Sequence, residues 1–527
     1  MSESKEHTRY AAIFAGGTMF SRVLGLVRDQ VWAFFIPAAF LDIFIAAFRF
    51  PNMLREIVGE GASNAAFVPM FSKYNDKKSK KAYKELISVC FGAMILILGL
   101  ITVVGIIVIP FIGSGIDFLA KFSPASEISA EKTELFIQVS MWTFPYLFMI
   151  CLAVFCMAPL YTKGIYSLPS ISPALLNVAF IAFAWLFRDH FPNPAWALVA
   201  GAWAGGLAQL GLQYWAMGRY TGVRMPSFKF NHPDLMTILL LLGPVLIGQA
   251  AAEVNRMIDI LFAFTLPEGT VRSLFLANRM VQLPLSIFGV AVSVAILPTL
   301  SRKSSKKDLK AFQTTLLSGL RSSLYLVLPA SVGLIILAHP IIHVAFERGY
   351  FGPEDTIETA TAVRIYGAGL LCFAWVKILV IGFYSKQDTK SPVIISSLCM
   401  GMNILLNFVL IGPLGYKGLA LATTLSFFLN AAFLYGILSV NVVKLWTRDY
   451  GDGLLKIVVS SVLMGIVAFG LNQMLQQSGF GGDAFWAALL KLILTVGVAA
   501  IFYGFITYSM KLEEAQNWYS IITRQKR

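Results

Sequence analysis

The sequence predicts an all-α integral membrane protein with about fourteen transmembrane helices, built as two six-helix repeats followed by two extra C-terminal helices. The composition is the first reason: 57% of the 527 residues are hydrophobic and only 13% are charged, about half the charged fraction of soluble proteins. Apolar runs of about 20 residues also recur along the whole chain, each long enough to cross a bilayer core of roughly 30 Å. Motifs from the first half of the chain then recur in the second half.

The apolar runs define the predicted spans. We expect them at residues 10–36, 39–72, 83–112, 132–161, 168–187, 194–218, 234–264, 270–301, 311–338, 357–385, 391–411, 415–440, 453–476 and 484–510. The first residues are polar and the first apolar run contains arginines, so we expect no removable signal peptide.

The loops predict the orientation. Clusters of lysine and arginine follow the even-numbered spans, as at 73–84 and 302–310, whereas odd-numbered connections such as 347–358 are acidic. Because basic residues stay on the cytoplasmic side, both termini are predicted to be cytoplasmic.

Three pairs of motifs indicate an internal repeat. Residues 46–52 align with 276–282, residues 66–73 with 295–302, and residues 161–169 with 384–392, at a nearly constant spacing. Each copy has an even number of spans, so the copies are parallel repeats, an architecture typical of transporters. The predicted divisions are an N-terminal lobe at 1–228, a C-terminal lobe at 229–444, and spans 13 and 14 with the C-terminus at 445–527.

Charge and motifs exclude several function classes. The net charge of +14 lies in loops beside the spans, so anionic membrane lipids are the expected partner and nucleic acid is not. The five cysteines lie in apolar spans without CxxC spacing and are interpreted as core residues. There is no P-loop, HExxH or GxSxG motif. We therefore expect a transporter without enzymatic activity or cofactor, driven by sodium, protons, the membrane potential or consumption of its substrate.

The first two spans contain polar and charged residues, which a membrane helix accepts only when they face a bundle interior or a wet cavity. They are Ser21, Arg22, Arg28, Asp29, Asp42, Arg49, Asn52, Arg55, Glu56 and Glu60. Because residues seven apart share a helix face, Arg22 aligns with Asp29, and Asp42 aligns with Arg49 and Glu56.

Two interpretations follow for these residues. They could pair with one another and lock the two helices together. Alternatively, the arginines could line a cavity and bind a phosphate-bearing head group, because the guanidinium group is always charged and matches phosphate bidentately. We favour the second interpretation for the arginines and keep the first for the acids.

The second repeat adds Arg279, at the position that matches Arg49. Gln282 and Ser286 share its helix face. Facing the first repeat, Arg279 would extend a basic cavity. The alternative is that it reaches toward the head groups from the end of its span.

Span 7 contains Glu253, Arg256 and Asp259 at spacings of three. One interpretation is a local ladder of ion pairs. The other combines Asp259 with oxygen-bearing residues of spans 11 and 12 as a site for a monovalent cation, since oxygen ligands around one carboxylate suit such an ion. The predicted ligands are Asp259, Asn403, Asn407 and Thr423.

Long motifs resemble the MurJ/MviN family of lipid II flippases, within the MOP exporter superfamily. They are SRVLGLVRD at 21–29, AFRFPNMLRE at 47–56, GEGASNAAFVPMFSKY at 59–74, LANRMVQLPLSIFGVAVSVAILPTLSRK at 276–303 and GFYSKQDTKSP at 382–392. The resemblance covers the whole chain and implies a V-shaped, two-lobed bundle with a cationic cavity and a lateral opening. It also implies a groove for the lipid tail formed by spans 13 and 14.

Carried over by position, the resemblance implies that the essential arginines are Arg22, Arg28, Arg55 and Arg279. It associates with them Ser21, Asp29, Asp42, Asn52 and Glu60, and implies a positive charge at Arg49. Sodium-binding relatives match the cation ligands given above, but a carboxylate is expected where this chain has Asn407.

The predicted function is to flip lipid II, an undecaprenyl-pyrophosphate-linked disaccharide peptide, from the cytoplasmic to the outer leaflet of the bacterial inner membrane by alternating access. Membrane lipids and the cell-wall synthesis machinery are the other expected partners. The alternatives are an exporter of another lipid-linked oligosaccharide or a cation-coupled drug exporter. An enzyme that polymerises glycans would need an outward catalytic acid, for which the loops offer only Asp117, Glu127 and the acids at 347–358.

Overall fold

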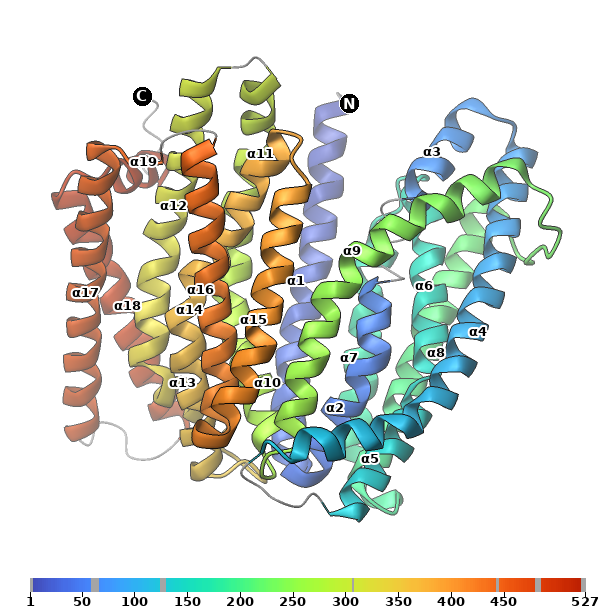
Figure 1. The fold of residues 1–527 in the computed structure, drawn as a ribbon, viewed down its shortest axis with the longest axis horizontal. Helices are drawn as coiled ribbons and strands as arrows, with labels where there is room; N and C mark the ends of the chain where they lie inside the picture. The colour runs from blue at the N-terminus through green and yellow to red at the C-terminus, as the bar shows by residue number, and fades with distance from the viewer. Residues whose placement is uncertain are drawn as a thin grey trace. The chain divides into compact units, whose positions relative to one another are not determined.

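A computed structural model of the chain describes residues 3–57, 66–123, 129–305, 308–441, 445–478 and 485–522 (Figure 1). Over these residues the regular structure is entirely helical, which confirms the predicted all-α class. The chain divides into two compact units: the first comprises Met1–Arg272 with Arg348–Phe351, and the second comprises Ser273–Glu347 with Gly352–Arg527.

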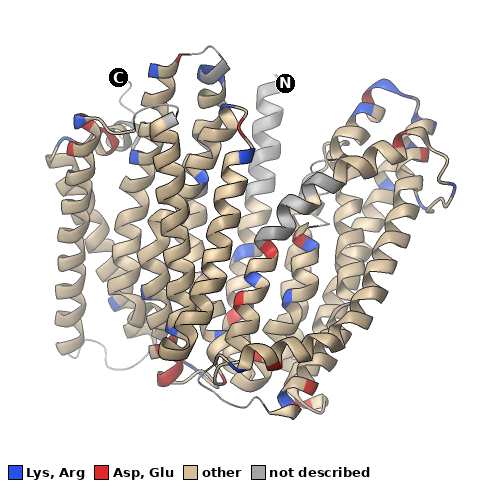
Figure 2. Cartoon of the chain, in the orientation of Figure 1, with Lys and Arg blue, Asp and Glu red and all other residues tan. Residues whose placement is uncertain are grey.

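Ten described helices are long and apolar enough to cross a membrane. They are Lys80–Ala120, Ala130–Tyr161, Ser167–Leu186, Pro194–Thr221, Leu309–Ile336, Pro353–Ser385, Lys390–Leu414, Tyr416–Val440, Arg448–Gln477 and Phe485–Ser509. Charged residues gather mainly at helix ends, and few lie part-way along a helix (Figure 2). All fourteen predicted spans are helical over most of their described residues, but a total of fourteen crossings stays a prediction.

The first unit packs its helices closely. It contains α1 (Glu3–Phe35), α2 (Ala38–Leu54), α3 (Val68–Lys77), α4 (Lys80–Ala120), α5 (Ala130–Thr143), α6 (Tyr146–Tyr161), α7 (Ser167–Leu186), η3 (Arg188–His190), α8 (Pro194–Thr221), α9 (Pro233–Phe264) and the start of α10 (Thr270–Pro284). Helix α7 packs against α1 and α8. Glycines permit this approach, because a methyl group at Gly17 would overlap Ser170 and one at Gly205 would overlap Leu176.

Several predicted spans are interrupted. The span predicted at 132–161 is divided into α5 and α6 at Pro145, whose nitrogen cannot donate a helical hydrogen bond. The span predicted at 39–72 contains α2 and α3, and residues 58–65 between them lie outside the described part. The span predicted at 270–301 contains a π-helical turn, Leu285–Gly289, directly after Pro284. Such turns widen the helix locally and are a recognised cause of kinks.

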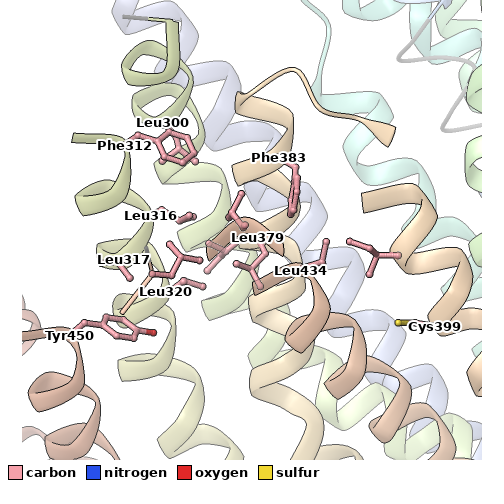
Figure 3. Close-up of a cluster of buried hydrophobic side chains, with 14 residues drawn as sticks. Leu300, Phe312, Leu316, Leu317, Leu320, Leu379, Phe383, Cys399, Leu434 and Tyr450 are labelled. Carbon is pink, nitrogen blue, oxygen red and sulfur yellow. The ribbon is translucent and has the colours of Figure 1, made fainter. Parts of the chain in front are cut away.

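The second unit surrounds a core of leucine and phenylalanine. It contains the remainder of α10, η4 (Leu285–Gly289), α11 (Val290–Ser305), α12 (Leu309–Ile336), α13 (Ala338–Phe346), α14 (Pro353–Ser385), α15 (Lys390–Leu414), α16 (Tyr416–Asn441), α17 (Arg448–Gln477), α18 (Phe485–Ser509) and α19 (Glu513–Ile522). Leu316 and Leu320 of α12 meet Leu379 of α14 and Leu434 of α16 in this core (Figure 3).

The sequence repeat reappears in the packing. Helix α8 packs against α6 and α7 in the first unit, and its counterpart α16 packs against α14 and α15 in the second. The boundary between the compact units nevertheless lies within α10, so that α9 belongs to the first unit. The compact units are defined by the packing of the helices, whereas the repeats are defined by sequence similarity, so the two boundaries differ. The predicted lobes at 1–228 and 229–444 and the region 445–527 stay predictions.

The motif at 382–392 has a structural role. It forms the tight turn between α14 and α15, where Gln387 has a left-handed backbone with φ of 63°. The Asp388 carboxylate accepts hydrogen bonds from the backbone N–H groups of Lys390 and Ser391, and so caps α15. Hydrogen bonding from Ser391 holds the pKa of Asp388 below its ordinary value.

One buried arginine joins three helices of the second unit. Arg321 of α12 is 8% exposed, and its Nε lies 2.7 Å from Oε1 of Glu514 on α19. Its two Nη atoms each lie 3.5 Å from a carboxylate oxygen, on Asp449 of α17 and on Glu513 of α19. The C-terminal helix is therefore anchored to α12 and α17 by charge.

Arg321→Ala is expected to lower the thermal stability of the protein. The change leaves Glu514, whose side chain is 11% exposed, without its main counter-ion, which costs about 3 kcal/mol. The exposure of buried cysteines such as Cys399 to a fluorogenic thiol reagent during heating reports unfolding in detergent. The double variant Arg321→Ala/Glu514→Gln should recover much of the loss. Equal melting of the single variant and the wild type would contradict the anchoring role.

Candidate functional site

The first unit contains a cluster of charges where α2 meets α9, which we call the α2–α9 charge network. It consists of Arg49, Asn52, Arg55, Glu56, Glu253 and Arg256. Both helices are apolar over most of their length, and α2 and α9 pack against each other. The network is thus the polar part of an otherwise apolar helix contact.

Glu253 is the centre of this network, and its side chain is only 8% exposed. One carboxylate oxygen accepts a hydrogen bond from Arg49 at 2.5 Å, and the other accepts one from Arg256. Arg256 also donates to Glu56 at 3.2 Å, and Arg49 lies 3.8 Å from Glu56. The two glutamates therefore hold two arginines side by side across α2 and α9.

The α2 side of the network is organised locally. Asn52 donates to Glu56 and accepts from the Nε atom of Arg55, at 3.2 and 3.0 Å. Residues three and four apart lie on one helix face, so these contacts need only the helix itself. The predicted alignment of Arg49 with Glu56 is confirmed by their contact, whereas the pairing of both with α9 could not be read from α2 alone.

Within the network, three arginines face two glutamates, which leaves one net positive charge. Arg256 has a side chain that is 57% exposed, so it is open to a ligand. Arginine and carboxylate here form exchangeable charge-assisted bonds, and a phosphate can replace a carboxylate on the same guanidinium group. The arrangement is suited to reversible binding of an anion.

Arg28 lies apart from this network, buried where α1 meets α7. It donates to Asp29 at 2.6 and 3.0 Å and to Asn177 at 3.2 Å, and its guanidinium group lies 4.4 Å from the centre of the Trp32 ring. Asn177 also donates to the carbonyl oxygen of Ser21. Arg28 and Asp29 therefore pair within α1, and Asn177 links Arg28 to α7. These contacts are not the predicted pairing between the first two spans.

Asp42 is buried and binds the first turn of α10. Its two carboxylate oxygens accept hydrogen bonds from the backbone N–H groups of Gly269 and Arg272, each at 2.7 Å. The N-terminus of a helix carries a partial positive charge that a carboxylate stabilises. Asp42 therefore fixes the start of α10 through backbone N–H groups.

The other predicted residues are placed as follows. Ser21 is half-buried and Arg22 is exposed, both on α1. Glu60 lies outside the described residues. Arg279 is half-buried in the second unit, 5.7 Å from the centre of the Phe275 ring. Its predicted convergence with the arginines of the first unit stays a prediction.

The predicted cation ligands are distributed over both units. Asp259 is half-buried in the first unit. Asn403 and Asn407 are buried on α15, where the Asn407 amide donates to Asn403 at 3.4 Å, and Thr423 lies half-buried on α16. Among the described residues, no group of three His, Cys, Asp or Glu side chains is arranged to hold a metal ion. The cation site stays a prediction.

The second unit also carries an apolar groove of about 340 Å³ between α12 and α17. Its lining residues are Val332, Ile336, Val462, Gly465, Ile466 and Phe469. This groove involves α17, the thirteenth predicted span, for which the family resemblance implies contact with a lipid tail.

Sequence reasoning missed some functional contacts. The spacing of Glu253 and Arg256 predicts a pair within one helix, and their contact confirms it. The spacing does not reveal that both residues also reach across to Arg49 and Glu56. Asn177 was not singled out, although an asparagine in an apolar span is a signal for a buried polar partner.

Known proteins similar to this chain share one description. A family model described as lipid II flippase MurJ matches residues 33–490. The probable lipid II flippase MurJ of Vibrio cholerae serotype O1 is 33% identical over 519 residues, covering 97% of this chain and 98% of that protein. The lipid II flippase MurJ of Burkholderia cenocepacia is 31% identical over 428 residues, covering 80% of this chain and 81% of that protein.

Solved structures show the same fold. A structure of lipid II flippase MurJ in an inward closed conformation is similar, with a TM-score of 0.75 and 24% identity, covering 95% of this chain and 99% of that one. A multidrug resistance MATE family transporter of the MOP superfamily in an inward-facing conformation gives a TM-score of 0.64 at 14% identity, covering 85% of this chain and 98% of that one.

Proposed function

Because this chain belongs to the MurJ family of lipid II flippases, we propose that it moves lipid II by binding the pyrophosphate of that lipid in the α2–α9 charge network. The family makes it a multi-pass membrane transporter of cell-wall synthesis rather than an enzyme. The observation that carries the proposal is the pair of arginines, Arg49 and Arg256, held together by Glu253 in an apolar surrounding.

The chemistry of the substrate explains why such a network is needed. Lipid II joins a long apolar tail to a pyrophosphate and a sugar–peptide head group, and the charged part cannot cross hydrocarbon unaided. Arginines in a wet cavity can neutralise the pyrophosphate while the tail stays in the lipid. Arg256 is the most exposed arginine of the network and is the first to meet the ligand; Arg49 follows when Glu253 releases it.

Release of the substrate requires competing acids. A transporter that held pyrophosphate with unopposed arginines would bind it in every state and turn over slowly. Glu253 and Glu56 already occupy the arginines in this structure, so they can displace the pyrophosphate once the substrate reaches the other leaflet. Arg22, Arg55 and Arg279 are the further members of the proposed site. Arg28 lies apart from the α2–α9 charge network and would contact the substrate only after it exchanges Asp29 for a phosphate.

We assign the lipid tail to the apolar groove between α12 and α17. Its lining is formed by aliphatic and aromatic side chains, and a polyprenyl chain needs only such a surface. The groove is open, because two of its lining side chains on α17, Ile466 and Phe469, are exposed.

Ile466→Gln is expected to weaken lipid II binding by about tenfold, since it replaces an apolar contact worth about 1.4 kcal/mol. Ile501→Gln on α18 is the matched control, because Ile501 is similarly exposed but does not line the groove. The affinities of both variants for lipid II and for a short-tailed analogue, measured in nanodiscs, show whether the groove at Ile466 or the surface at Ile501 contacts the lipid tail. A loss that is equal for both variants would contradict the assignment of the tail.

The cellular setting follows from the same proposal. We place the protein in the bacterial inner membrane with both termini on the cytoplasmic side, as its basic loops indicate. Sodium, protons or the membrane potential would drive transport, with Asp259, Asn403, Asn407 and Thr423 as candidate cation ligands. Other enzymes of cell-wall synthesis are candidate partners.

Complementation tests the proposed substrate and site together. Cells depleted of their own lipid II flippase receive the wild type, Arg28→Ala or Arg279→Ala, with membrane levels checked by immunoblot. We expect rescue by the wild type and failure of both well-expressed variants. No rescue by the wild type would favour another lipid-linked glycan. Rescue by both variants would show that these arginines are structural.

A further inference from the structure

The connection between α8 and α9, residues 222–232, is an extended segment fixed to the surface of α4. The Ser227 N–H donates to the carbonyl oxygen of Ser88 at 2.8 Å, and the Ser88 hydroxyl donates to the carbonyl oxygen of Met225 at 2.5 Å. The Tyr214 hydroxyl donates to the backbone carbonyl oxygen of Arg224. A methyl group at Gly92 would overlap the Ser227 carbonyl, so the segment lies directly on the helix (Figure 1).

The two helices that flank this segment fix its depth in the membrane. On α4, Glu85 is the last charged residue before a continuous apolar run that ends at Asp117. On α8, Arg219 is the only charged residue. The segment pairs with Ser88, three residues beyond Glu85, and follows Arg219 by a few residues. The border between polar and apolar sequence on α4 and the one on α8 therefore both lie beside the segment. Such borders lie at the level of the lipid head groups, so the segment lies there too.

The outward side chains of the segment combine apolar and basic character. Met225, Phe228 and Phe230 are 75%, 54% and 41% exposed, and Arg224, directly before Met225, and Lys229, between the two phenylalanines, are also exposed. Aromatic residues exposed on the last turns of α8, Trp215 and Tyr220, continue this belt. Lys84 of α4 adds a further positive charge, since its Nζ lies beside Gly222. Water alone would not stabilise so many exposed apolar groups.

We propose that residues 224–230 form an interfacial anchor that binds anionic phospholipids. Met225, Phe228 and Phe230 insert among the upper acyl chains, and Arg224 and Lys229 bind the phosphate groups of the same leaflet. Aromatic and basic residues together are the usual combination at this depth. The anchor holds the linker between the two sequence repeats and thus the start of α9, the helix that carries Glu253 and Arg256. The binding of phospholipid is independent of the substrate that the protein carries.

A fluorescent label at position 228 tests the anchor in the full-length protein. Phe228→Cys is made in a Cys372→Ser background, because the other four cysteines are buried, and is labelled with bimane. Asp76→Cys is the matched control, since Asp76 is exposed at the end of α3 among the polar residues of the neighbouring loop. Nanodiscs contain phosphatidylcholine with either brominated phosphatidylcholine or brominated phosphatidylglycerol, and aqueous iodide is the second quencher.

We expect brominated lipid to quench the label at position 228 but not the label at position 76. Brominated phosphatidylglycerol should quench the label at 228 more than brominated phosphatidylcholine does. Arg224→Gln/Lys229→Gln should remove the preference for phosphatidylglycerol. Each lost charge is expected to lower the affinity for phosphatidylglycerol relative to phosphatidylcholine by about fivefold. Iodide quenching at 228 as strong as at 76, without quenching by lipid, would place the segment in water and overturn the anchor. Equal quenching by both brominated lipids would overturn the binding of anionic phospholipid.

Discussion

Arg49→Ala is expected to reduce lipid II transport by about a hundredfold, which corresponds to about 2.7 kcal/mol for a lost charge-assisted contact to phosphate. The variant still folds, because Glu253 keeps its bond to Arg256. It removes one of the network's positive charges and leaves a carboxylate facing the incoming pyrophosphate. Translocation of fluorescent lipid II in proteoliposomes measures the loss, and Arg49→Lys should retain part of the activity, since charge remains without the bidentate geometry.

A second variant separates ligand binding from internal charge balance. Arg49→Ala/Glu253→Gln removes both partners of the buried pair, so no unbalanced carboxylate remains. If Arg49 only neutralised Glu253, this double variant would transport as the wild type does. Binding of phosphate by Arg49 predicts that transport stays low. Glu253→Gln alone is the matched control, and we expect it to bind lipid II more tightly than the wild type.

Asp42→Asn is expected to slow transport much more than it weakens binding. The two carboxylate oxygens accept hydrogen bonds from two backbone N–H groups at the start of α10. The asparagine amide has only one acceptor oxygen, so one of these bonds is lost and the other loses the strength that the negative charge gives it. If these hydrogen bonds lose about 2 kcal/mol, the population of the conformation that contains them falls about thirtyfold relative to the other conformations of the transport cycle. The conformational cycle then becomes unbalanced, although no side chain of the α2–α9 charge network has changed.

Two measurements on the same preparation check this expectation. Lipid II affinity in nanodiscs should be equal to or tighter than that of the wild type, while the turnover rate in proteoliposomes falls. Asp189→Asn, at a side chain that is 78% exposed, provides the matched control and should change neither quantity. Loss of binding with a normal rate at saturation would show that Asp42 acts on the substrate and not on α10.

The helices themselves could be predicted from the sequence because hydrophobic runs and loop charges are local properties. The contact of Arg49 with Glu56, seven residues along one helix, also followed from helical spacing. By contrast, the partner of Arg49 is Glu253, which lies 204 residues away on another helix, and no periodicity within either helix fixes that contact. Tertiary packing decides which charges meet.

Two further residues show what limited the sequence-based account of the site. Asp42 was grouped with the arginines because it shares their helix face, but its partners are backbone N–H groups, which carry no signal in a sequence pattern. The residue type predicts that Arg28 lines the cavity, yet Asp29, Asn177 and Trp32 surround its guanidinium group in this structure. In both cases the residue type was informative, and its partner became known only from the fold.

The central claim is that the α2–α9 charge network recognises the pyrophosphate of lipid II. The most direct test compares affinities for lipid II and for an analogue with an uncharged linkage in place of the pyrophosphate, in the wild type and in Arg49→Ala/Glu253→Gln. We predict that the wild type strongly prefers lipid II and that the variant distinguishes the two ligands far less. A variant that discriminates between them as strongly as the wild type would contradict the claim.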